Sequence, residues 1–241
     1  MGEMTTQAQP SVPGARNVRD ELVGAAVALL NEDGPDALQT RKVAAAAGTS
    51  TMAVYTHFGG MRELIAAVAE EGLRQFDVAL TVPQTDDPVA DLVATGVAYR
   101  GYAIQRPHMY RLMFGSTSAH GINAPAENVL TLTIAEIEQD YPSFAHVVRG
   151  VHRSMTAGRL TVGAPGDGTR GATSDAEIVA TAAQFWALIH GFVMLELAGF
   201  FGQEGAAIEP VLASMTTNLL VALGDSPERA TRSQQSALGA R

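Results

Sequence analysis

Hydrophobic residues recur along most of this chain at the spacing of amphipathic helices. The clearest stripe lies at i, i+3, i+4, i+7 and i+8, and it consists of Leu22, Ala25, Ala26, Leu29 and Leu30. Asn17 and Asp20 have the character of a helix-capping pair before this stripe, and Gly34-Pro35 stops it. The pattern predicts a helix here and, because it repeats along the chain, an all-α protein.

The same spacing predicts further helices, separated by polar or proline-containing breaks. We expect them over 61–80, 88–105, 107–114, 126–140, 142–158, 174–201 and after Pro210. Residues 115–125 and 163–173 are rich in glycine and other small residues, so they are expected to be loops. Ser174 and Glu177 have the spacing of a capping box, which marks the start of the 174–201 helix.

Residues 39–58 are predicted to form two short helices joined by a tight turn. The residues that would form their shared core are small or apolar: Val43, Ala44, Ala47, Val54 and Phe58. Gly48 lies where the chain must turn sharply, and Tyr55 is expected to cap the small core. This arrangement is typical of the helix-turn-helix, whose second helix can enter the DNA major groove. A compact helical hairpin with another role could show the same pattern.

Residues 17–73 resemble the DNA-binding domain of the TetR family of bacterial repressors. The resemblance rests on Thr40-Arg41, Ala44, Ala47-Gly48, Ser50, Val54-Tyr55 and Phe58. It implies that Arg41 contacts a base or a phosphate. It also implies that the other DNA-binding residues lie on or near the recognition helix, and these are Thr40, Thr49, Ser50, Thr51, Met52, Tyr55, Thr56 and His57. Hydroxyl groups can donate to phosphate oxygens, and arginine can bind guanine through two hydrogen bonds, so the chemistry agrees.

Three positions depart from the family pattern. Met61 stands where the family usually has a lysine near the phosphate backbone, and Gly60 is a weaker helix cap than Ser or Asn. Gln39 stands where a capping Thr or Ser is common. Because each phosphate that a protein neutralises steepens the salt dependence, we expect modest DNA affinity with a shallow salt slope.

The segment from Phe185 to Leu197 resembles the Trp…His-Gly signature of one TetR C-terminal subfamily. Trp186, His190 and Met194 fall at i, i+4 and i+8, so they share one face of a helix. They could form the wall of a pocket for a small molecule, or they could be a satisfied core. Further candidates for the same pocket lie on other predicted helices: Tyr102, Met109, His152 and Met155.

The 174–201 helix is apolar on nearly all sides from residue 185 onward, so it must be covered all round. A second subunit is the simplest cover. With the last helix it would form a four-helix dimer interface, for which the candidates are Phe192, Leu195, Phe200, Leu212, Met215 and Leu219. Such a dimer would have the symmetry that is needed to read a palindromic operator.

Composition narrows the class of protein. The chain has 241 residues, no cysteine and a formal net charge of −9, which argues against a general nucleic-acid coat protein. Residues 16–62 carry equal numbers of acidic and basic side chains, so the acidity lies mainly beyond them. Residues 185–201 come closest to a membrane span, but His190 and Glu196 interrupt them. We expect a cytoplasmic protein without a signal peptide and without a membrane partner.

Catalytic and metal-binding motifs are not found in the sequence. The six histidines form no HxxxH or HxxE pair, and no Gly-x-Ser-x-Gly elbow or phosphate-binding glycine loop occurs. We therefore expect no metal, no cofactor and no enzymatic activity. An enzyme that uses a cavity at His190 or His152 would need a nucleophile, metal set or acid pair that the sequence does not offer.

The predicted domain organisation has four parts. Residues 1–15 form a disordered arm, 16–75 a three-helix helix-turn-helix domain, 76–224 a helical ligand-binding and dimerisation domain, and 225–241 a disordered tail. The predicted function is a dimeric repressor that binds a palindromic operator in double-stranded DNA and is released by a small, largely apolar effector. The alternative is a small-molecule-binding dimer with weak DNA affinity that acts through a protein partner.

Overall fold

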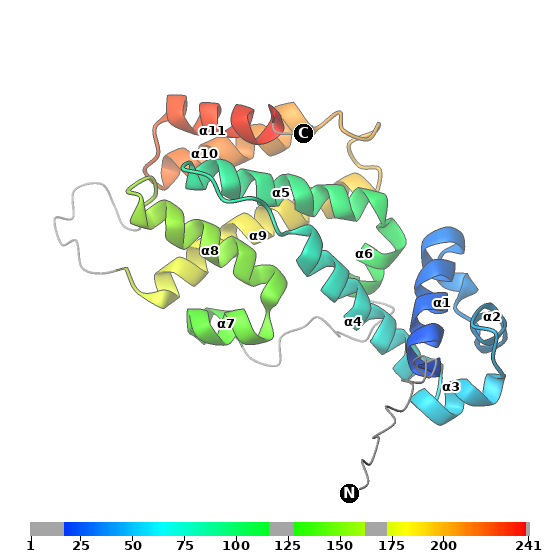
Figure 1. The fold of residues 1–241 in the computed structure, drawn as a ribbon. Coiled ribbons are helices and arrows are strands. Elements are labelled where there is room, and N and C mark those ends of the chain that lie inside the picture. Colours follow the sequence, from blue (N-terminus) through cyan, green and yellow to red (C-terminus); the bar gives the residue numbers. More distant parts are fainter. Residues whose placement is uncertain (1–16, 116–127, 162–172, 240–241) are drawn as a thin grey trace, which may run out of the picture. The chain divides into compact units, whose positions relative to one another are not determined.

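A computed structural model describes residues 17–115, 128–161 and 173–239, and every regular element in these ranges is a helix (Figure 1). The all-α prediction is thereby confirmed. The predicted arm at 1–15 and most of the predicted loops at 115–125 and 163–173 lie outside the described residues. The chain divides into two compact units, Met1–Val68 and Ala69–Arg241, and both this boundary and the predicted one after residue 75 fall within one helix.

The N-terminal unit contains α1 (Val18–Asp33), the short η1 (Pro35–Ala37), α2 (Thr40–Ala46), α3 (Thr51–Phe58) and the first residues of α4 (Met61–Ala79). Asn17 caps α1 by accepting a hydrogen bond from the N–H of Arg19, and Gly34 ends it with a positive φ of 79°, which favours glycine. The core of this unit comes from several elements, and its buried members are Leu22, Ala26, Leu30, Val43, Ala44, Val54, Phe58 and Leu64.

The turn between α2 and α3 depends on Gly48. Its φ is 65°, a left-handed conformation that a residue with a Cβ adopts only at a cost. The N–H of the next residue, Thr49, donates to the carbonyl of Ala44 at 2.9 Å, so the chain folds back on the end of α2. Gly59, with φ of 76°, ends α3 in the same way. Glycines at both ends of a short helix fix where α3 begins and stops.

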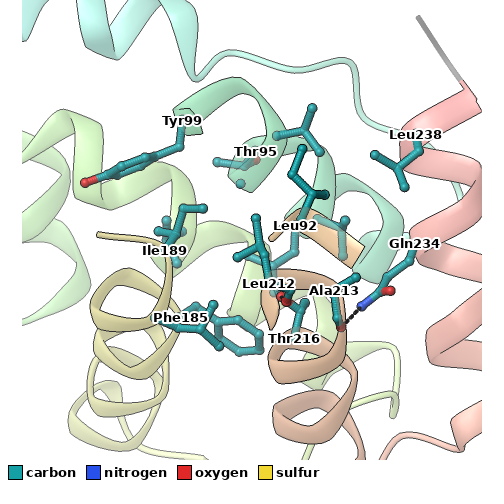
Figure 2. Close-up of a pocket in the computed structure, with 16 residues that line it drawn as sticks. Leu92, Thr95, Tyr99, Phe185, Ile189, Leu212, Ala213, Thr216, Gln234 and Leu238 are labelled. Carbon is teal, nitrogen blue, oxygen red and sulfur yellow. Dashed lines mark hydrogen bonds between the residues drawn. The ribbon is translucent and has the colours of Figure 1, made fainter. Parts of the chain in front are cut away.

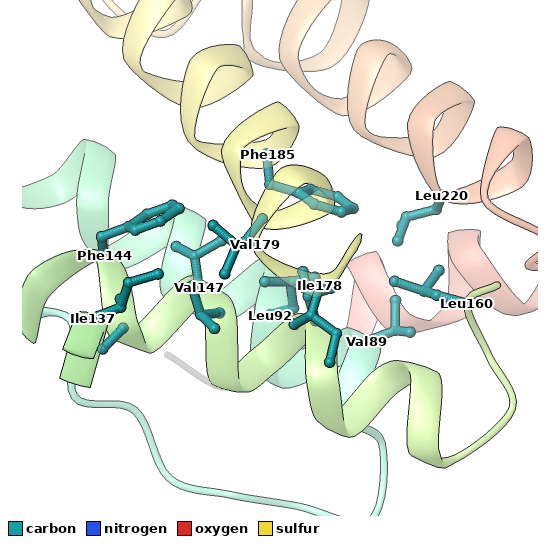
Figure 3. Close-up of a cluster of buried hydrophobic side chains, with 14 of the residues drawn as sticks. Val89, Leu92, Ile137, Phe144, Val147, Leu160, Ile178, Val179, Phe185 and Leu220 are labelled. Atoms are coloured by element: carbon teal, nitrogen blue, oxygen red, sulfur yellow. The ribbon is translucent and has the colours of Figure 1, made fainter. Parts of the chain in front are cut away.

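The C-terminal unit begins in α4 and continues with α5 (Pro88–Gln105) and α6 (Pro107–Phe114). The elements that follow are η2 (Val129–Thr131), α7 (Ile134–Asp140), α8 (Pro142–Thr156), α9 (Asp175–Leu197), η3 (Ile208–Ala213), α10 (Ser214–Ala222) and α11 (Pro227–Gly239). Helix α8 packs against α5, α7 and α9. Figure 3 shows the core at this junction, where Leu92, Val147 and Phe185 meet from three different helices. Each buried side chain of this size stabilises the fold by about 1.5–3 kcal/mol.

Two predicted helices are more divided than their sequence pattern suggested. The 126–140 segment forms the short η2 and then α7, because Thr133 begins a new helix through a capping box with Glu136. The helix expected after Pro210 begins one turn earlier as η3, a π-helical segment that leads directly into α10.

The predicted disordered tail is wrong for its described part. Residues 227–239 form α11, which packs against α5 and α10. Its buried face consists of the small residues Ala230, Ser233 and Ala237 at i, i+3 and i+7. These side chains give almost no hydrophobic signal in the sequence, but they let α11 approach α5 closely.

A buried polar cluster ties α11 to the rest of the unit. Arg159 donates to both carboxylate oxygens of Asp225, to Asp87 and to the hydroxyl of Ser233. Ser233 in turn donates to Asp87 at 2.6 Å. Burial raises the pKa of Asp87, but the hydrogen bonds from Ser233 and the Ala90 N–H, with the charge of Arg159, outweigh it and hold this pKa below its ordinary value. We call these four residues the α11 clamp.

Helix α9 is the most apolar element, and by length and composition alone it could cross a membrane. In the structure it is a core helix that packs against α5, α8 and α10. Near its end, Glu196 is buried and accepts two hydrogen bonds from Arg100, each 2.8 Å, and one from the N–H of Gly205. Two-pronged, charge-assisted hydrogen bonds of this kind are strong, and this pair joins the end of α9 to α5.

Candidate DNA-binding surface and small-molecule cavity

The outer face of α3 is formed by the residues that were predicted to read DNA. Met52 is 65% exposed and Tyr55 is 53% exposed, although both are large apolar or amphipathic side chains. Ser50, Thr51, Thr56 and His57 are exposed beside them. The predicted role of Tyr55 as a cap on the small core is wrong, because Val54 and Phe58, one turn apart, fill the interior and leave Tyr55 on the outer face.

Local hydrogen bonds limit what some of these side chains can do. The hydroxyl of Thr56 donates to the carbonyl of Met52 at 2.9 Å, so it faces an external partner as an acceptor. Ser50 occupies the N-cap position of α3 but makes no side-chain capping bond there, so its hydroxyl is available for another partner. Thr49, in the turn, is half-buried. Ser50 is therefore better placed than Thr56 to donate to a phosphate oxygen.

Positive charge lies at the start of α2. Arg41 and Lys42 are both exposed there, next to the half-buried Thr40. Gln39, which precedes them, makes no capping bond to α2, and its side-chain amide donates to the carbonyl of Asp36 at 3.0 Å. The exposed cations give this end of the helix-turn-helix the charge that phosphate contacts require.

A cavity of about 470 Å³ lies in the C-terminal unit between α4, α6, α7, α8 and α9. Four aromatic side chains line it: Phe114, Tyr141, Phe144 and Trp186. Four charged side chains also line it: Glu70, Arg74, Asp77 and Asp140. We call this space the aromatic cavity.

Two of the charged groups of the aromatic cavity, Arg74 and Asp77, have partners that fix their orientation. Arg74 donates two hydrogen bonds, at 2.7 and 2.6 Å, to Glu71, and hydrogen bonding by Arg74 is the main reason that the pKa of Glu71 is lowered. On α8, His146 lies with Nε2 at 2.9 Å from Oδ1 of Asp77, and Arg149 Nη2 lies 3.3 Å from its Nδ1. Since arginine can only donate, Nδ1 of His146 accepts and Nε2–H donates to Asp77.

A second, narrower space lies between α5, α8, α9, η3, α10 and α11 (Figure 2), and its volume is about 90 Å³. We call it the apolar crevice. Its few polar side chains already have partners. Three donate to backbone carbonyls: Thr95 to Asp91, Thr216 to Leu212 and Gln234 to Ala213. The hydroxyl of Tyr99 bonds to the side chains of Tyr110 and His190. The crevice therefore presents hydrocarbon and is small for a drug-sized ligand, whose pockets usually exceed about 300 Å³.

The predicted stripe of Trp186, His190 and Met194 has two interpretations, a pocket wall or a satisfied core, and Trp186 and His190 fit different ones. Trp186 lines the aromatic cavity, whereas His190 belongs to a hydrogen-bonded core cluster. Its Nδ1 lies 2.8 Å from the hydroxyl of Tyr110 and 3.1 Å from that of Tyr99, and the two hydroxyls are 2.8 Å apart. Burial lowers the pKa of His190 and raises those of both tyrosines, so all three are neutral at pH 7.

The other predicted ligand residues lie elsewhere in the unit. Tyr102 is buried and donates to the carbonyl of Gly72 at 3.0 Å, and Met109 is fully buried beside the same glycine. His152 is exposed, and Met155 packs against the core at α8. The structure brings none of these four to the lining of the aromatic cavity or of the apolar crevice.

The six predicted dimer residues also separate into two groups. Leu195, Phe200 and Met215 are exposed, with Phe200 at 73%. The other three already have partners within the chain. Phe192 is buried and stacks on Phe201, Leu212 lines the apolar crevice, and Leu219 packs against the core. An exposed apolar surface on α9, the segment after it and α10 remains for a partner.

Most residues of the aromatic cavity were not singled out from the sequence. On α4 a signal was present, because Glu70, Arg74 and Asp77 recur at i, i+4 and i+7 on one face of a helix. Such a charged stripe is usually a solvated face. Glu70 and Arg74 are exposed in the structure as well, and α8 meets this face of α4 through the contact of His146 with Asp77.

Comparisons with known proteins match the N-terminal and the C-terminal unit to the same family of regulators. A family described as bacterial regulatory proteins of the tetR family matches residues 22–68, and one described as the tetracyclin repressor-like C-terminal domain matches residues 92–219. An uncharacterized HTH-type transcriptional regulator of Mycobacterium tuberculosis is 26% identical over 192 residues, which cover 77% of this chain and 72% of the relative.

Two further similarities were found, one to a protein that matches only part of this chain and one to a solved structure. The class A tetracycline repressor from transposon 1721 of Escherichia coli is 42% identical over 66 residues, 27% of this chain and 30% of the repressor. A protein of unknown function from Rhodococcus sp. RHA1 has a similar structure, with a TM-score of 0.63 and 25% identity. The match covers 90% of this chain and 100% of that one.

Proposed function

Because the chain belongs to the TetR family of transcriptional regulators, we propose that it is a dimeric repressor whose operator binding responds to a small molecule. Ligand-responsive repression is typical of this family. Such a regulator acts in the cytoplasm and has no catalytic activity of its own. The alternative, a dimer that acts only through a protein partner, has less support because the DNA-binding family match covers most of the N-terminal unit.

The exposed face of α3 supports DNA recognition. Met52 and Tyr55 are large exposed side chains on this face, and each can contact DNA: the thioether at a thymine methyl, the phenol at a phosphate. Arg41, exposed on α2, adds a cation that can bind a phosphate or a guanine. The exposure of Met52, Tyr55 and Arg41 is the observation on which the DNA-binding part of the proposal rests.

The exposed apolar residues of the C-terminal unit support a dimer. Leu195 on α9 and Met215 on α10 would pack against the same residues of a second copy, since a two-fold interface uses one surface twice. Two copies related in this way would present two recognition helices to a palindromic operator.

The aromatic cavity is the proposed effector site. Helix α4 contributes Glu70, Leu73, Arg74 and Asp77 to its wall, and the first residues of the same helix belong to the N-terminal unit. A ligand that favours one position of α4 would thereby bias the DNA-binding unit. This mechanism requires that the ligand bind the DNA-free conformation more tightly than the DNA-bound one.

A genomic DNA pulldown tests the DNA-binding part. The purified protein is incubated with sheared DNA from its source organism, and the retained fragments are sequenced, beside a variant with Arg41→Ala and Tyr55→Ala. We expect a palindrome to be enriched by the wild type and lost by the variant. If a well-folded dimer enriches no sequence even at low salt, the repressor proposal fails and the partner-dependent alternative gains support.

A further inference from the structure

We infer that the effector of the aromatic cavity is an aromatic organic cation, an inference that rests on the proposed function. The volume of about 470 Å³ lies within the range of about 300–1,000 Å³ that is usual for sites of drug-sized ligands. The cavity is therefore large enough for a drug-sized molecule.

The rings of the cavity wall favour a flat ligand. Trp186 lies edge-on to Phe144, with ring centroids 5.5 Å apart and planes at 81°, and it is inclined at 66° to Phe114 at 6.3 Å. Faces and edges of different rings thus meet at one place. A cation over the face of an aromatic ring is attracted by the ring quadrupole, most strongly by that of tryptophan.

The charge of the wall selects the sign of the ligand. Glu70, Asp77 and Asp140 are three carboxylates, and Arg74 is one guanidinium, so the lining carries a formal charge of −2. The guanidinium of Arg74 is already engaged by the carboxylate of Glu71. Little positive charge is left for an anionic ligand, while a cation finds acceptors on several sides.

The His146 contact uses one of the two carboxylate oxygens of Asp77. Nε2 of His146 donates to Oδ1, because Nδ1 accepts from Arg149. Across the described residues no hydrogen bond reaches Oδ2, the second oxygen of Asp77, which can therefore accept from a ligand.

These charges also argue against the largely apolar effector that the sequence suggested. Glu70 and Asp140 are exposed and can stay hydrated, but a neutral hydrocarbon that filled the cavity would remove water from the partly buried Asp77 and give nothing in return. A ligand with a delocalised positive charge covers the rings and compensates the carboxylates at the same time.

Calorimetric titration of the full-length dimer with three flat three-ring compounds tests the inference at pH 8. The compounds are 10-methylacridinium, neutral acridine and anthracene-9-carboxylate, so size is held nearly constant while charge runs from positive to negative. We expect the cation to bind about 10-fold or more tightly than acridine, and the carboxylate to bind more weakly than both. Equal affinities for the three compounds, or no binding of the cation, would overturn the inference.

Variants locate the binding. Replacing Glu70→Gln together with Asp77→Asn should weaken the cation by about 10-fold and leave acridine unchanged or improved, since only charge is removed. Glu63→Gln, on the same helix but outside the lining, is the matched control and should change neither affinity. Loss of both affinities in the double variant, with the dimer and its melting temperature intact, would show that charge is not what the cavity selects.

Failure of this inference and failure of the proposed function give different results. A protein that enriches a palindrome but prefers acridine or the carboxylate remains a repressor with another effector class. A protein that binds the cation at the aromatic cavity but enriches no DNA keeps the site and loses the repressor function.

Discussion

Arg159 and Asp225 form a two-pronged ion pair in which Nε donates to Oδ1 at 3.0 Å and Nη2 donates to Oδ2 at 2.6 Å. The carboxylate of Asp225 is fully buried, and the guanidinium is 12% exposed. The pair lies at the centre of the α11 clamp. The last helix is thus held by this polar cluster, through Ser233, as well as by the packing of its small residues on α5.

Removing the cation of this clamp should destabilise the C-terminal unit strongly. In Arg159→Ala the buried carboxylate of Asp225 loses its two-pronged partner and keeps an ion pair with the partly exposed Arg229, at 3.2 Å. The expected loss is about 2–3 kcal/mol in the free energy of unfolding. Urea unfolding measures it. The control is Arg74→Ala, because that arginine is 65% exposed and its pair with Glu71 should contribute less than about 1 kcal/mol. Equal losses in the two variants would show that the clamp is not a buried interaction.

Acid should remove the stabilisation that Glu196 provides. Burial raises the pKa of this carboxyl, but hydrogen bonds from Arg100 and the Gly205 N–H, with the charge of Arg100, lower it more, so its pKa lies below the ordinary value of 4.5. A carboxyl with a depressed pKa stabilises the folded state above its unfolded pKa and loses this contribution as the pH falls through the folded one.

We therefore expect the stability difference between wild type and Glu196→Gln to be constant above about pH 5 and to shrink at lower pH. Urea unfolding from pH 3 to pH 7 measures this difference. A constant difference over the whole range would contradict the role of the Arg100 contact in holding the carboxylate charged.

Gly72 should not tolerate a side chain. A Cβ at this position would lie 2.4 Å from Sδ of Met109 and 2.9 Å from Sδ of Met113, and both methionines are almost fully buried. We expect Gly72→Ala to destabilise the protein by about 1–3 kcal/mol, because the methionines must leave their positions in a packed core.

Gly101→Ala is the matched control for this substitution, since it is also within a helix and no atom lies within 4 Å of its added Cβ. There the change should stabilise the protein by about 0.5–1 kcal/mol, the helix propensity of alanine over glycine. Thermal melting of both variants decides the prediction, and a stabilised Gly72→Ala would refute the close packing of α4 on α6.

The outer face of α3 should matter for DNA and hardly for stability. Tyr55→Ala removes a half-exposed side chain, so we expect weaker operator binding with a melting temperature within about 2 °C of the wild type. Arg41→Ala, if the side chain contacts a phosphate, should also reduce the slope of log K against log salt by about 0.9. Fluorescence polarisation of labelled operator DNA at several salt concentrations measures both. A large drop in melting temperature for Tyr55→Ala would instead place this ring in the core.

Charge on the exposed apolar surface should prevent dimer formation. Phe200→Asp with Met215→Asp places two carboxylates on a surface that the proposal pairs with its own copy. Light scattering should show a dimer for the wild type and a monomer for the double variant. The control is Val78→Asp, which changes an exposed apolar residue on α4 and should leave the dimer intact. A wild-type monomer would disprove the assignment of this surface.

The helices with wide apolar stripes could be predicted from the sequence alone. Leu22, Ala26 and Leu30 predicted α1, and the same three are its buried residues. Capping boxes at Thr133 and Ser174 mark real helix starts, but only the second was recognised. Strongly periodic helices can be predicted because each carries its signal in its own residues.

The parts that sequence reasoning missed depend on neighbours distant in the chain. Helix α11 buries small residues, and the pair that holds it joins Asp225 to Arg159, 66 residues earlier. Asp77 becomes part of a cavity only because Phe144 and Trp186 arrive from other helices. Likewise, His190 shares a stripe with Trp186 but is bonded to Tyr99 and Tyr110, which no local pattern indicates.

Trp186 is the single tryptophan of the chain, and it lies in the wall of the aromatic cavity. Emission excited at 295 nm therefore comes from one known place in the protein. It would report the occupation of the cavity without any label, by quenching or by a shift in wavelength. For the same reason an unfolding curve followed by this emission describes the C-terminal unit alone, and melting of the helix-turn-helix unit would be invisible in it.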